Sequence, residues 1–520
     1  MKNCRSRKLK DCEEVSMSVG ALLIRADASA MIGTGHVMRC IALAQAWQDA
    51  GGRAAFAMAE STEAVRARLA RESCDALPVA FAPGKSDDAR QTIALAEAQN
   101  CKWVVVDGYQ FDADYVRALR EAGLKVLFVD DYGHLQQYAA DVVLNQNVSA
   151  TPALYPNREP GTRLFLGPRY VLLRREFGVW RGWKRSIPPV CRAVLVLMGG
   201  SDEANVTATV IDALHLAGVD NLQTTVLVGG SNRHFTQLCD RAAHSGPAIE
   251  LLRDVSDVGE LIARADIAIA AAGSTVWELC LLGLPALLID VADNQTAAAK
   301  ELHKRGCAIH IGDRAVTAET VAERLKSLIG AQGLRQSLSQ CSGELVDGNG
   351  ATRVVSILRG QERLRLRPVQ EDDRHMLWEW ANDPGVRAAS FSPDPIPWET
   401  HVAWFDEKLR SSRESGSKAF IFIAEDEEGS MVGQIRFDRR PDGDWEVSLS
   451  LDKSMRGRGL ANALIANGVR ELLKETGRTR IHAYVKPANV ASAKLFERVA
   501  FRTVGMDQVR GNAAIHLIYE

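Results

Sequence analysis

A histidine follows a glycine turn near the start of the chain, in the segment GTGH at residues 33–36. An apolar run at residues 21–24 precedes this turn, and a helical pattern follows it. A glycine turn between a strand and a helix presents backbone N–H groups and positive potential to a phosphorylated ligand. Gly35 lets the backbone approach such a ligand, whereas His36 could accept a proton or could only cap the helix. The spacing by itself leaves both roles of His36 open.

A second glycine turn, AGST at residues 272–275, also lies between an apolar run and a helical pattern. Hydroxyls and N–H groups of this turn could hold a pyrophosphate, and a carboxylate one turn into the helix could bind ribose hydroxyls. The predicted ligand contacts here are Ser274, Thr275 and Glu278, and the next apolar run leads to the segment DNQ at residues 293–295, at another helix start. An ordinary helix N-cap gives the same pattern, but the further glycine turn GGSD at residues 199–202 favours a nucleotide diphosphate site.

The segment RGRGLA at residues 456–461 follows a strand pattern and opens a helix with periodic apolar residues. It fits the pattern (R/Q)xxGx(G/A), in which backbone N–H groups hold the pyrophosphate of coenzyme A. Glycines are needed because side chains would block the approach of the diphosphate. The predicted cofactor contacts in this segment are Arg456, Gly457, Gly459 and Ala461.

Strand alternation predicts a polar face close to this segment. In the run at residues 445–451, Glu446 and two serines share one face, while apolar side chains share the other. His482 and Tyr484 share one face of the next predicted strand. A solvent-facing polar stripe would show the same pattern, whereas a family resemblance of this domain implies that Glu446 is the base that deprotonates an amine through a water molecule.

The elements that must position these residues form three groups. Two groups alternate apolar strands with helical patterns, which predicts an α/β fold with two parallel, Rossmann-like sheets. The third group has consecutive alternating strands, which predicts an α+β domain. Ligands are expected outside the carboxyl ends of the parallel strands. The predicted boundaries are a tail at residues 1–19, lobes at residues 20–165 and 166–355, and a third domain at residues 361–520.

The composition excludes several classes of protein. The chain has 520 residues, of which 46% are hydrophobic and 25% charged, and its formal net charge is −2. These values indicate a soluble globular protein and exclude a broadly basic nucleic-acid binder. No apolar run is long enough to span a membrane, and the amino terminus lacks a signal-peptide pattern, so we expect a cytoplasmic protein. The ten cysteines lack metal-ligand spacing, so we expect buried reduced thiols and no metal site.

The motifs of the first two lobes resemble those of the UDP-sugar hydrolases of pseudaminic acid biosynthesis, which are relatives of type B glycosyltransferases. The resemblance covers about residues 20–355. It is carried by RxDxSxxIGxGHVMRC, VVDGY, FVDD, NQN, MGGSD, AGSTxxE and DNQ, in this order along the chain. These hydrolases release UDP from UDP-2,4-diacetamido-2,4,6-trideoxy-β-L-altropyranose, so the resemblance implies a UDP-sugar substrate.

The resemblance also implies roles for individual residues. His36 would activate water for attack at the anomeric carbon, Tyr109 would lie beside the sugar, and Arg174 would contact the substrate. Glu278 would bind the uridine ribose. Contacts to the diphosphate and the sugar would come from Ser274, Thr275, Asn294 and Gln295. The two acids at residues 130–131 are interpreted as structural or sugar-binding rather than as metal ligands.

Residues 361–520 resemble GNAT acetyltransferases, through the RGRGLA segment and through Asn489 and Ser492 further along. The resemblance implies acetyl-CoA as co-substrate, with Asn489 and Ser492 among its contacts. Many members of the family have a tyrosine four residues after this serine, as the acid for the leaving thiolate, and a glycine before the final phenylalanine. Here the two positions hold Phe496 and Ala500. Another tyrosine, Tyr484, or water would then supply the proton, or the thiolate would leave unaided.

The fusion predicts a bifunctional enzyme with a UDP-sugar and acetyl-CoA as its small-molecule partners, and with no nucleic-acid or membrane partner. In pseudaminic acid biosynthesis, N-acetylation of a UDP-4-amino sugar precedes the hydrolase step, so the GNAT domain would make the substrate of the hydrolase. In one alternative, the GNAT domain acylates another amino sugar or a protein amine. In another, the lobes transfer the sugar to an acceptor instead of water. A third alternative, a binding module without activity, is disfavoured by the presence of His36 and Glu278.

Overall fold

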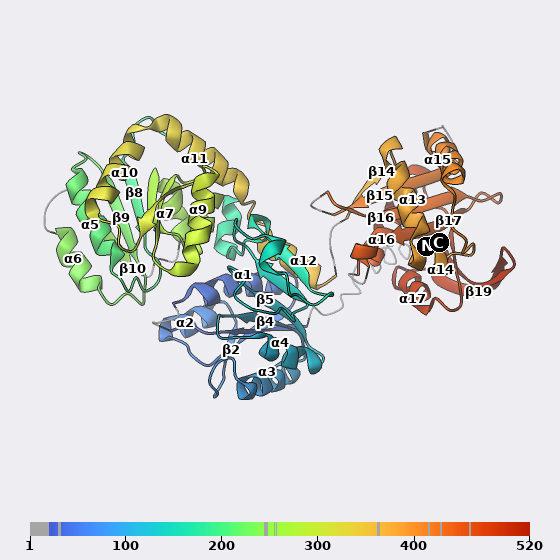
Figure 1. Ribbon diagram of the computed structural model, residues 1–520, viewed down its shortest axis with the longest axis horizontal. Coiled ribbons are helices and arrows are strands. Elements are labelled where there is room, and N and C mark those ends of the chain that lie inside the picture. Colours follow the sequence, from blue (N-terminus) through green and yellow to red (C-terminus); the bar gives the residue numbers. More distant parts are fainter. Residues whose placement is uncertain are drawn as a thin grey trace, which may run out of the picture. The chain divides into compact units, whose positions relative to one another are not determined.

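The computed structural model describes residues 20–29, 33–243, 248–253, 255, 257–360, 364–413, 417–426, 429–456 and 459–520. The chain divides into two compact units, Met1–Val355 and Ser356–Glu520. Two sheets belong to the amino-terminal unit and one to the carboxyl-terminal unit (Figure 1). The predicted tail at residues 1–19 and the predicted cofactor contact Gly457 lie outside the described residues.

The first sheet has seven strands, all parallel, in the order β3-β2-β1-β4-β5-β6-β7. Its strands are β1 (Ala21–Ala26), β2 (Arg53–Met58), β3 (Asp75–Pro78), β4 (Cys101–Asp107), β5 (Lys125–Val129), β6 (Val142–Asn145) and β7 (Arg163–Leu166). Its helices are α1 (Gly35–Asp49), α2 (Glu63–Arg71), α3 (Ser86–Ala98) and α4 (Ala113–Glu121). Every residue of β1 and of β6 is buried, as expected for central strands with helices on both faces of the sheet (Figure 1).

The second sheet has six parallel strands in the order β10-β9-β8-β11-β12-β13. These strands are β8 (Ala193–Leu197), β9 (Gln223–Val228), β10 (Ile249–Arg253), β11 (Ile267–Ala271), β12 (Ala286–Asp290) and β13 (Ile309–Asp313). The helices that cover them are α5 (Val206–Ala217), α6 (Phe235–Ala243), α7 (Val258–Arg264), α8 (Thr275–Leu281), α9 (Thr296–Lys304), α10 (Ala318–Gly330) and α11 (Gln332–Leu345). Alternate residues of β8 pack into separate hydrophobic clusters on the two faces of the sheet.

Both sheets reverse their strand order once, between β1 and β4 in the first and between β8 and β11 in the second. In an open parallel sheet, the crevice at such a reversal, outside the carboxyl ends of the strands, is where ligands bind. The GTGH turn follows β1 and the GGSD turn follows β8, whereas the AGST turn follows β11. The sequence prediction of two Rossmann-like lobes is therefore confirmed, with each glycine turn at a reversal point.

A long connection joins the two sheets, and α12 (Gly350–Leu358) packs against it. Arg353 donates a hydrogen bond to the carbonyl oxygen of Arg169 in this connection. Gly350 lies so close to the connection that an added Cβ would be 2.2 Å from the carbonyl oxygen of Val171. Only glycine fits at this position, so the helix is held close to the segment between the lobes.

The carboxyl-terminal unit contains a seven-stranded mixed sheet in the order β14-β15-β16-β17-β18-β20-β19. Its strands are β14 (Arg365–Pro368), β15 (Ala419–Glu425), β16 (Met431–Arg439), β17 (Trp445–Leu451), β18 (Ile481–Val485), β19 (Arg502–Val509) and β20 (Asn512–Tyr519). Its helices are α13 (Arg374–Asn382), α14 (Pro384–Ala389), α15 (Trp398–Arg413), α16 (Leu460–Thr476) and α17 (Val490–Arg498). The prediction of an α+β third domain is confirmed.

The parallel strands β17 and β18 pair over only two rungs, Trp445 with Ile481 and Glu446 with His482. Beyond these rungs the two strands continue without pairing, which opens the sheet between them. The opening begins directly after the rung that holds Glu446, the predicted base.

The expectation that all cysteines are reduced is wrong for one pair, because Cys307 and Cys341 form a disulfide. The two residues are 34 positions apart, so their spacing resembles no short motif. Cys307 follows α9 and Cys341 lies on α11, and only the packing of α11 brings them together. The free cysteines among the described residues are Cys40, Cys74, Cys101, Cys191, Cys239 and Cys280. All of these except Cys239 are buried.

Candidate active sites

One cavity of about 1310 Å³ is lined by turns from both reversal points of the amino-terminal unit. All nine residues that the sequence predicts as contacts or as the base in this unit line it. They are Gly35, His36, Tyr109, Arg174, Ser274, Thr275, Glu278, Asn294 and Gln295. The structure therefore brings together residues that lie up to 260 positions apart, on both lobes. A cavity of this size accommodates a ligand as large as a nucleotide sugar.

His36 lies in the first turn of α1, and its ring is held by a carboxylate from the neighbouring strand. Its Nδ1 is 2.6 Å from Oδ1 of Asp107, the last residue of β4. An ionised carboxylate can only accept, so Nδ1 carries the hydrogen and donates it. The other ring nitrogen, Nε2, is then free of hydrogen in the neutral ring and can take a proton. The pairing gives His36 the tautomer that a general base requires.

Arg39 holds Asp107 from the other side. Its Nε and Nη2 both donate to Asp107, each over 2.7 Å, and its Nη1 donates to Asp131 over 2.6 Å. Burial alone raises the pKa of Asp107, but the charge of Arg39 and the hydrogen bonds from Arg39 and His36 outweigh it, and the pKa lies well below its ordinary value. Asp107 is therefore ionised at neutral pH and remains an acceptor for His36.

The roles of Asp107 and Arg39 were not predicted from the sequence. A signal was present, because Asp107 ends an apolar strand and Arg39 stands one helical turn after His36. This signal could not be recognised in the sequence, because Asp107 approaches His36 only if β4 lies next to β1. Two other strands, β2 and β3, separate β1 from β4 along the chain. The acids at residues 130–131 have separate structural roles, since Asp130 accepts from His134 and Tyr138 while Asp131 accepts from Arg39.

Tyr109 connects the two lobes across the cavity. Its hydroxyl donates to Oδ2 of Asp131 over 2.6 Å and accepts from Nδ2 of Asn294 over 2.6 Å. Its ring packs edge-on against the ring of His36, with the centroids 5.1 Å apart. Burial and the Asp131 charge raise the pKa of Tyr109, so its hydroxyl stays protonated. Tyr109 is 37% exposed, which leaves part of its ring open to the cavity.

The glycine turns bring backbone from the two lobes close together. A Cβ added to Gly200, in the turn after β8, would lie 2.8 Å from Oγ1 of Thr34 in the first lobe. Ser274 is the N-cap residue of α8, yet its side chain makes no capping bond, which leaves its hydroxyl to the cavity that it lines. Gln295 accepts a hydrogen bond from the N–H of Val291 and thereby fixes the loop after β12.

Glu278 and Arg174 bind each other in this structure. Nη2 of Arg174 donates to Oε1 of Glu278 over 2.9 Å, and its Nε donates to Glu176 over 2.8 Å. Glu176 in turn accepts from Arg68 of α2 in the first lobe. Burial raises the pKa of Glu278, although the charge of Arg174 opposes this. These ion pairs link both lobes to the connection between them, and they hold the Glu278 carboxylate at the cavity wall.

Glu446 lies at the last paired rung before β17 and β18 separate. Its side chain is 46% exposed, and its Oε2 is 3.9 Å from Nη1 of Arg440. The same Nη1 donates to the hydroxyl of Tyr484 over 2.7 Å. The opposite face of β17, with Trp445 and Val447, is buried in the hydrophobic core. The alternation that the sequence predicted is therefore present.

The predicted coenzyme A contacts surround the start of α16 and of α17. Gly459 precedes α16 with φ +80°, a conformation that favours glycine. Arg456 forms an ion pair with Asp383 over 2.7 Å, while Ala461 lies within the first turn of α16. Asn489 caps α17 by accepting from the N–H of Ser492 over 3.1 Å.

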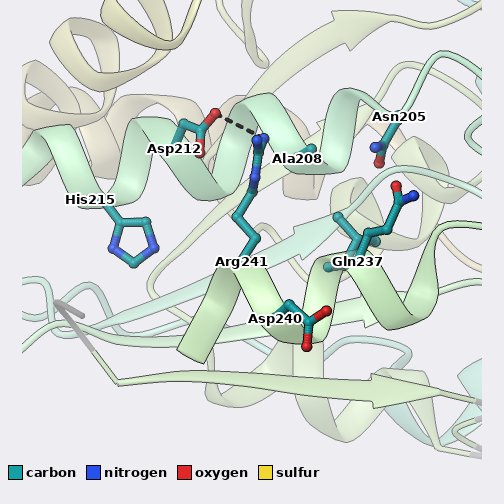
Figure 2. Close-up of a pocket in the computed structure, with 8 residues that line it drawn as sticks. Asn205, Ala208, Asp212, His215, Gln237, Asp240 and Arg241 are labelled. Carbon is teal, nitrogen blue, oxygen red and sulfur yellow. Dashed lines mark hydrogen bonds and ion pairs between the residues drawn. The ribbon is translucent and has the colours of Figure 1, made fainter. Parts of the chain in front are cut away.

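A second cavity, of about 660 Å³, lies between α5 and α6 on the second lobe. Figure 2 shows the ion pair of Arg241 with Asp212 across it, over 3.0 Å, and His215 on α5 beside it. None of the predicted site residues lines this cavity. Among the residues that the structure describes, no cluster of three or more His, Cys, Asp and Glu side chains could hold a metal ion. None of the helices described is both long and apolar enough to cross a membrane.

Comparison with known families identifies the last unit. Residues 363–502 match the family model described as acetyltransferase (GNAT) domain. The carboxyl-terminal unit is a GNAT acetyltransferase domain. Residues 194–343, in the second lobe, match the model described as glycosyltransferase family 28 C-terminal domain.

Comparison with individual proteins relates both units to known sequences. The chain is 25% identical, over 55% of its length and 97% of the other chain, to UDP-2,4-diacetamido-2,4,6-trideoxy-beta-L-altropyranose hydrolase of Campylobacter jejuni. It is 28% identical, over 45% of its length and 68% of the other, to the spore coat polysaccharide biosynthesis protein SpsG of Bacillus subtilis. An uncharacterized protein of Methanocaldococcus jannaschii is 22% identical over 92% of this chain and 96% of its own. The resemblance to a UDP-sugar hydrolase fused to a GNAT domain is confirmed.

Proposed function

We propose that the amino-terminal unit hydrolyses UDP-2,4-diacetamido-2,4,6-trideoxy-β-L-altropyranose to UDP and the free sugar. The observation that carries this proposal is that His36 lines the cavity between the two lobes while its ring is held by the buried Asp107. Similarity to the Campylobacter jejuni hydrolase supports the choice of substrate. The reaction breaks the bond between the anomeric carbon and the diphosphate oxygen.

The chemistry needs a base on one side of the anomeric carbon and anion stabilisation on the other. Water attacks the carbon as Nε2 of His36 takes its proton, and Asp107 stabilises the imidazolium that forms. The electron pair of the broken bond leaves with UDP. The hydroxyls of Ser274 and Thr275 and the backbone N–H groups of the glycine turns would receive the phosphate charge. Glu278, fixed by Arg174, would accept hydrogen bonds from the ribose hydroxyls.

A second candidate is transfer of the sugar to an acceptor hydroxyl, because His36 could deprotonate an alcohol as well as water. The match of residues 194–343 to a glycosyltransferase family model favours this candidate. The two reactions differ in one observable result. A hydrolase releases UDP from the nucleotide sugar in buffer alone, whereas a transferase requires an added acceptor.

For the carboxyl-terminal unit, we propose acetyl-CoA-dependent N-acetylation of the UDP-4-amino sugar that precedes this substrate. Glu446 would face the acceptor ammonium and help to remove its proton through water, and the loop before α16 would hold the coenzyme pyrophosphate. The fusion of the two units supports acetylation before hydrolysis, because the product of the acetylation site is then the substrate of the hydrolysis site. Another amino sugar or a protein amine is the alternative acceptor.

The test incubates the full-length protein with the UDP-4-amino sugar and acetyl-CoA and measures free CoA and free UDP separately. Both products are expected, with UDP formed only after CoA. His36→Gln should abolish UDP release and leave CoA release unchanged. His303→Gln, at an exposed histidine on α9, is the matched control and should change neither. CoA without UDP contradicts the hydrolase, and UDP-sugar consumption without CoA contradicts the acetylation.

A further inference from the structure

Two histidines of the GNAT domain are hydrogen-bonded to each other beside the opening between β17 and β18. Nδ1 of His482, on β18, is 2.8 Å from Nε2 of His516, on the adjacent strand β20. The two rings are stacked, with centroids 5.1 Å apart and planes 22° apart. The side chain of His482 is 9% exposed and that of His516 18%. His482 is also the rung partner of Glu446, so the pair lies on the face that carries the candidate base.

The partners of these rings fix where their hydrogens lie. Nε2 of His482 is 3.1 Å from Oδ2 of Asp444, and a carboxylate can only accept, so this nitrogen carries a hydrogen. In the neutral ring Nδ1 of His482 is then an acceptor, and Nε2 of His516 must donate to it. The nitrogen left with a free electron pair is Nδ1 of His516. The pair can therefore take one proton, at that atom, without breaking any of these hydrogen bonds.

The groups around His516 determine how well a positive charge on its ring is stabilised. Oδ2 of Asp507, on β19, is 3.9 Å from Nδ1 of His516, close enough to stabilise an imidazolium. The ring of Tyr484 stacks on His516, with centroids 4.6 Å apart. Arg440 contacts the hydroxyl of Tyr484 and approaches Glu446, and it opposes protonation of the pair. One carboxylate thus orients the pair and another faces the nitrogen that would be protonated.

We propose that His516 receives the proton lost by the acceptor ammonium during acetyl transfer, with His482 and Asp444 as positioning residues. This inference rests on the proposed acetylation. The ammonium gives one proton to Nδ1 of His516, and the neutral amine attacks the thioester carbon. A C–N bond forms, the C–S bond breaks, and the second proton of the nitrogen goes to the departing thiolate. The imidazolium then releases its proton to solvent. Glu446 faces the ammonium and holds it at the opening through the intervening water.

The electrostatic environment agrees with this role. Burial lowers the pKa of His516, and the adjacent His482 lowers it further, although Asp507 opposes both effects. The ring is therefore neutral at neutral pH and able to accept a proton. An imidazole is better matched to an amine near pH 7 than an ordinary carboxylate, because its pKa is closer to that of the group it deprotonates.

The first test needs no substrate and follows the histidine ring signals of the full-length protein by NMR as the pH is lowered. His482 and His516 are expected to shift together in one step, with protonation at Nδ1 of His516. Asp444→Asn should change the tautomer of both rings, and His375→Gln, at a 66% exposed histidine on α13, should change neither. Independent titration of the two rings would overturn the proposal, whatever the acceptor is.

The second test measures kcat/KM for CoA release with the UDP-4-amino sugar as a function of pH. His516→Gln is expected to lower kcat/KM at pH 7 by about 100-fold and to remove the acid limb of the profile. His482→Gln should displace that limb along the pH axis, because it removes the ring that accepts the hydrogen bond from Nε2 of His516. A purely structural role would lower the rate equally at all pH values.

The two tests separate failure of this inference from failure of the proposed function. If the wild-type protein releases no CoA with this sugar, the acceptor is wrong, and the NMR titration still decides whether the pair takes up one shared proton. If His516→Gln keeps the wild-type acid limb and remains folded by its thermal midpoint, His516 is not the proton acceptor. The proton of the acceptor ammonium would then be removed by Glu446 alone.

Discussion

At the scale of single residues, the geometry of the amino-terminal site depends on one carboxylate, that of Asp107. Asp107 fixes the tautomer of His36 and is itself held by two hydrogen bonds from Arg39. The sequence pointed to His36 through its glycine turn, because a turn is a local feature. It could not point to Asp107, whose role comes from the neighbouring position of β4 in the sheet.

The first prediction concerns catalysis by this pair. Asp107→Asn should lower kcat for UDP release by about 10²- to 10⁴-fold, because an amide can donate to Nδ1 and favour the wrong tautomer of His36. KM should change little, since Asp107 is buried and does not line the cavity. Steady-state UDP release measures both constants. Asp293→Asn, at a 98% exposed side chain near the same cavity, is the control and should leave kcat intact. A mutant kcat equal to that of the wild type contradicts the role of Asp107.

The second prediction concerns the pH dependence of stability. The folded state lowers the pKa of Asp107, so this group stabilises the protein at pH values above its unfolded pKa, about 4. The contribution is lost as the pH falls through the folded pKa. The difference in free energy of unfolding between wild type and Asp107→Asn should therefore be largest near neutral pH and shrink below about pH 4. Urea unfolding at several pH values measures this difference, and a constant difference contradicts it.

At the scale of elements, one turn of the GNAT domain has a residue that does not suit its backbone. Ala500 lies between α17 and β19 with φ +69°, where many members of the family have glycine. A side chain in this left-handed region costs roughly 1–2 kcal/mol. The sequence showed the replacement, and the structure shows why it matters for stability.

Ala500→Gly should therefore raise the free energy of unfolding of the carboxyl-terminal unit by about 1 kcal/mol, since the strain removed exceeds the added backbone entropy. Differential scanning calorimetry measures the shift of its midpoint. The matched substitution Ala463→Gly, within α16, should lower the stability by about 1 kcal/mol instead. Destabilisation by both substitutions would show that Ala500 is not strained.

The disulfide belongs to the same scale, because it joins α11 to the segment after α9. For residues 34 positions apart, closing the loop stabilises the folded state by about 3–4 kcal/mol. A reductant or Cys341→Ser should thus lower the thermal midpoint of the amino-terminal unit, whereas Cys239→Ser, at a free cysteine, should not. Alkylation of the unreduced, unfolded protein followed by mass spectrometry should leave Cys307 and Cys341 unmodified. Modification of both would contradict the disulfide.

At the scale of the whole molecule, the chain consists of two compact units, and each proposed reaction uses residues of one unit alone. Glu446→Gln should therefore lower CoA release without changing the rate at which added UDP-diacetamido sugar is hydrolysed. His36→Gln should have the converse effect. Separate assays with the two substrates measure these rates. If either substitution lowers both rates by a similar factor, the two sites do not act independently.

The sequence by itself determined the order of the elements, the two kinds of sheet and the glycine turns, because these depend on local periodicity and on residues such as Gly35 and Gly459. Its glycine turns and a family resemblance also predicted nine residues that line the cavity between the two lobes. Only the tertiary structure decided which carboxylate holds His36, that Arg174 binds Glu278, and that Cys307 and Cys341 are joined. The pair of His482 and His516 was likewise beyond the sequence. Each of these contacts joins residues on different elements, and their distance apart is set by strand order and helix packing rather than by spacing along the chain.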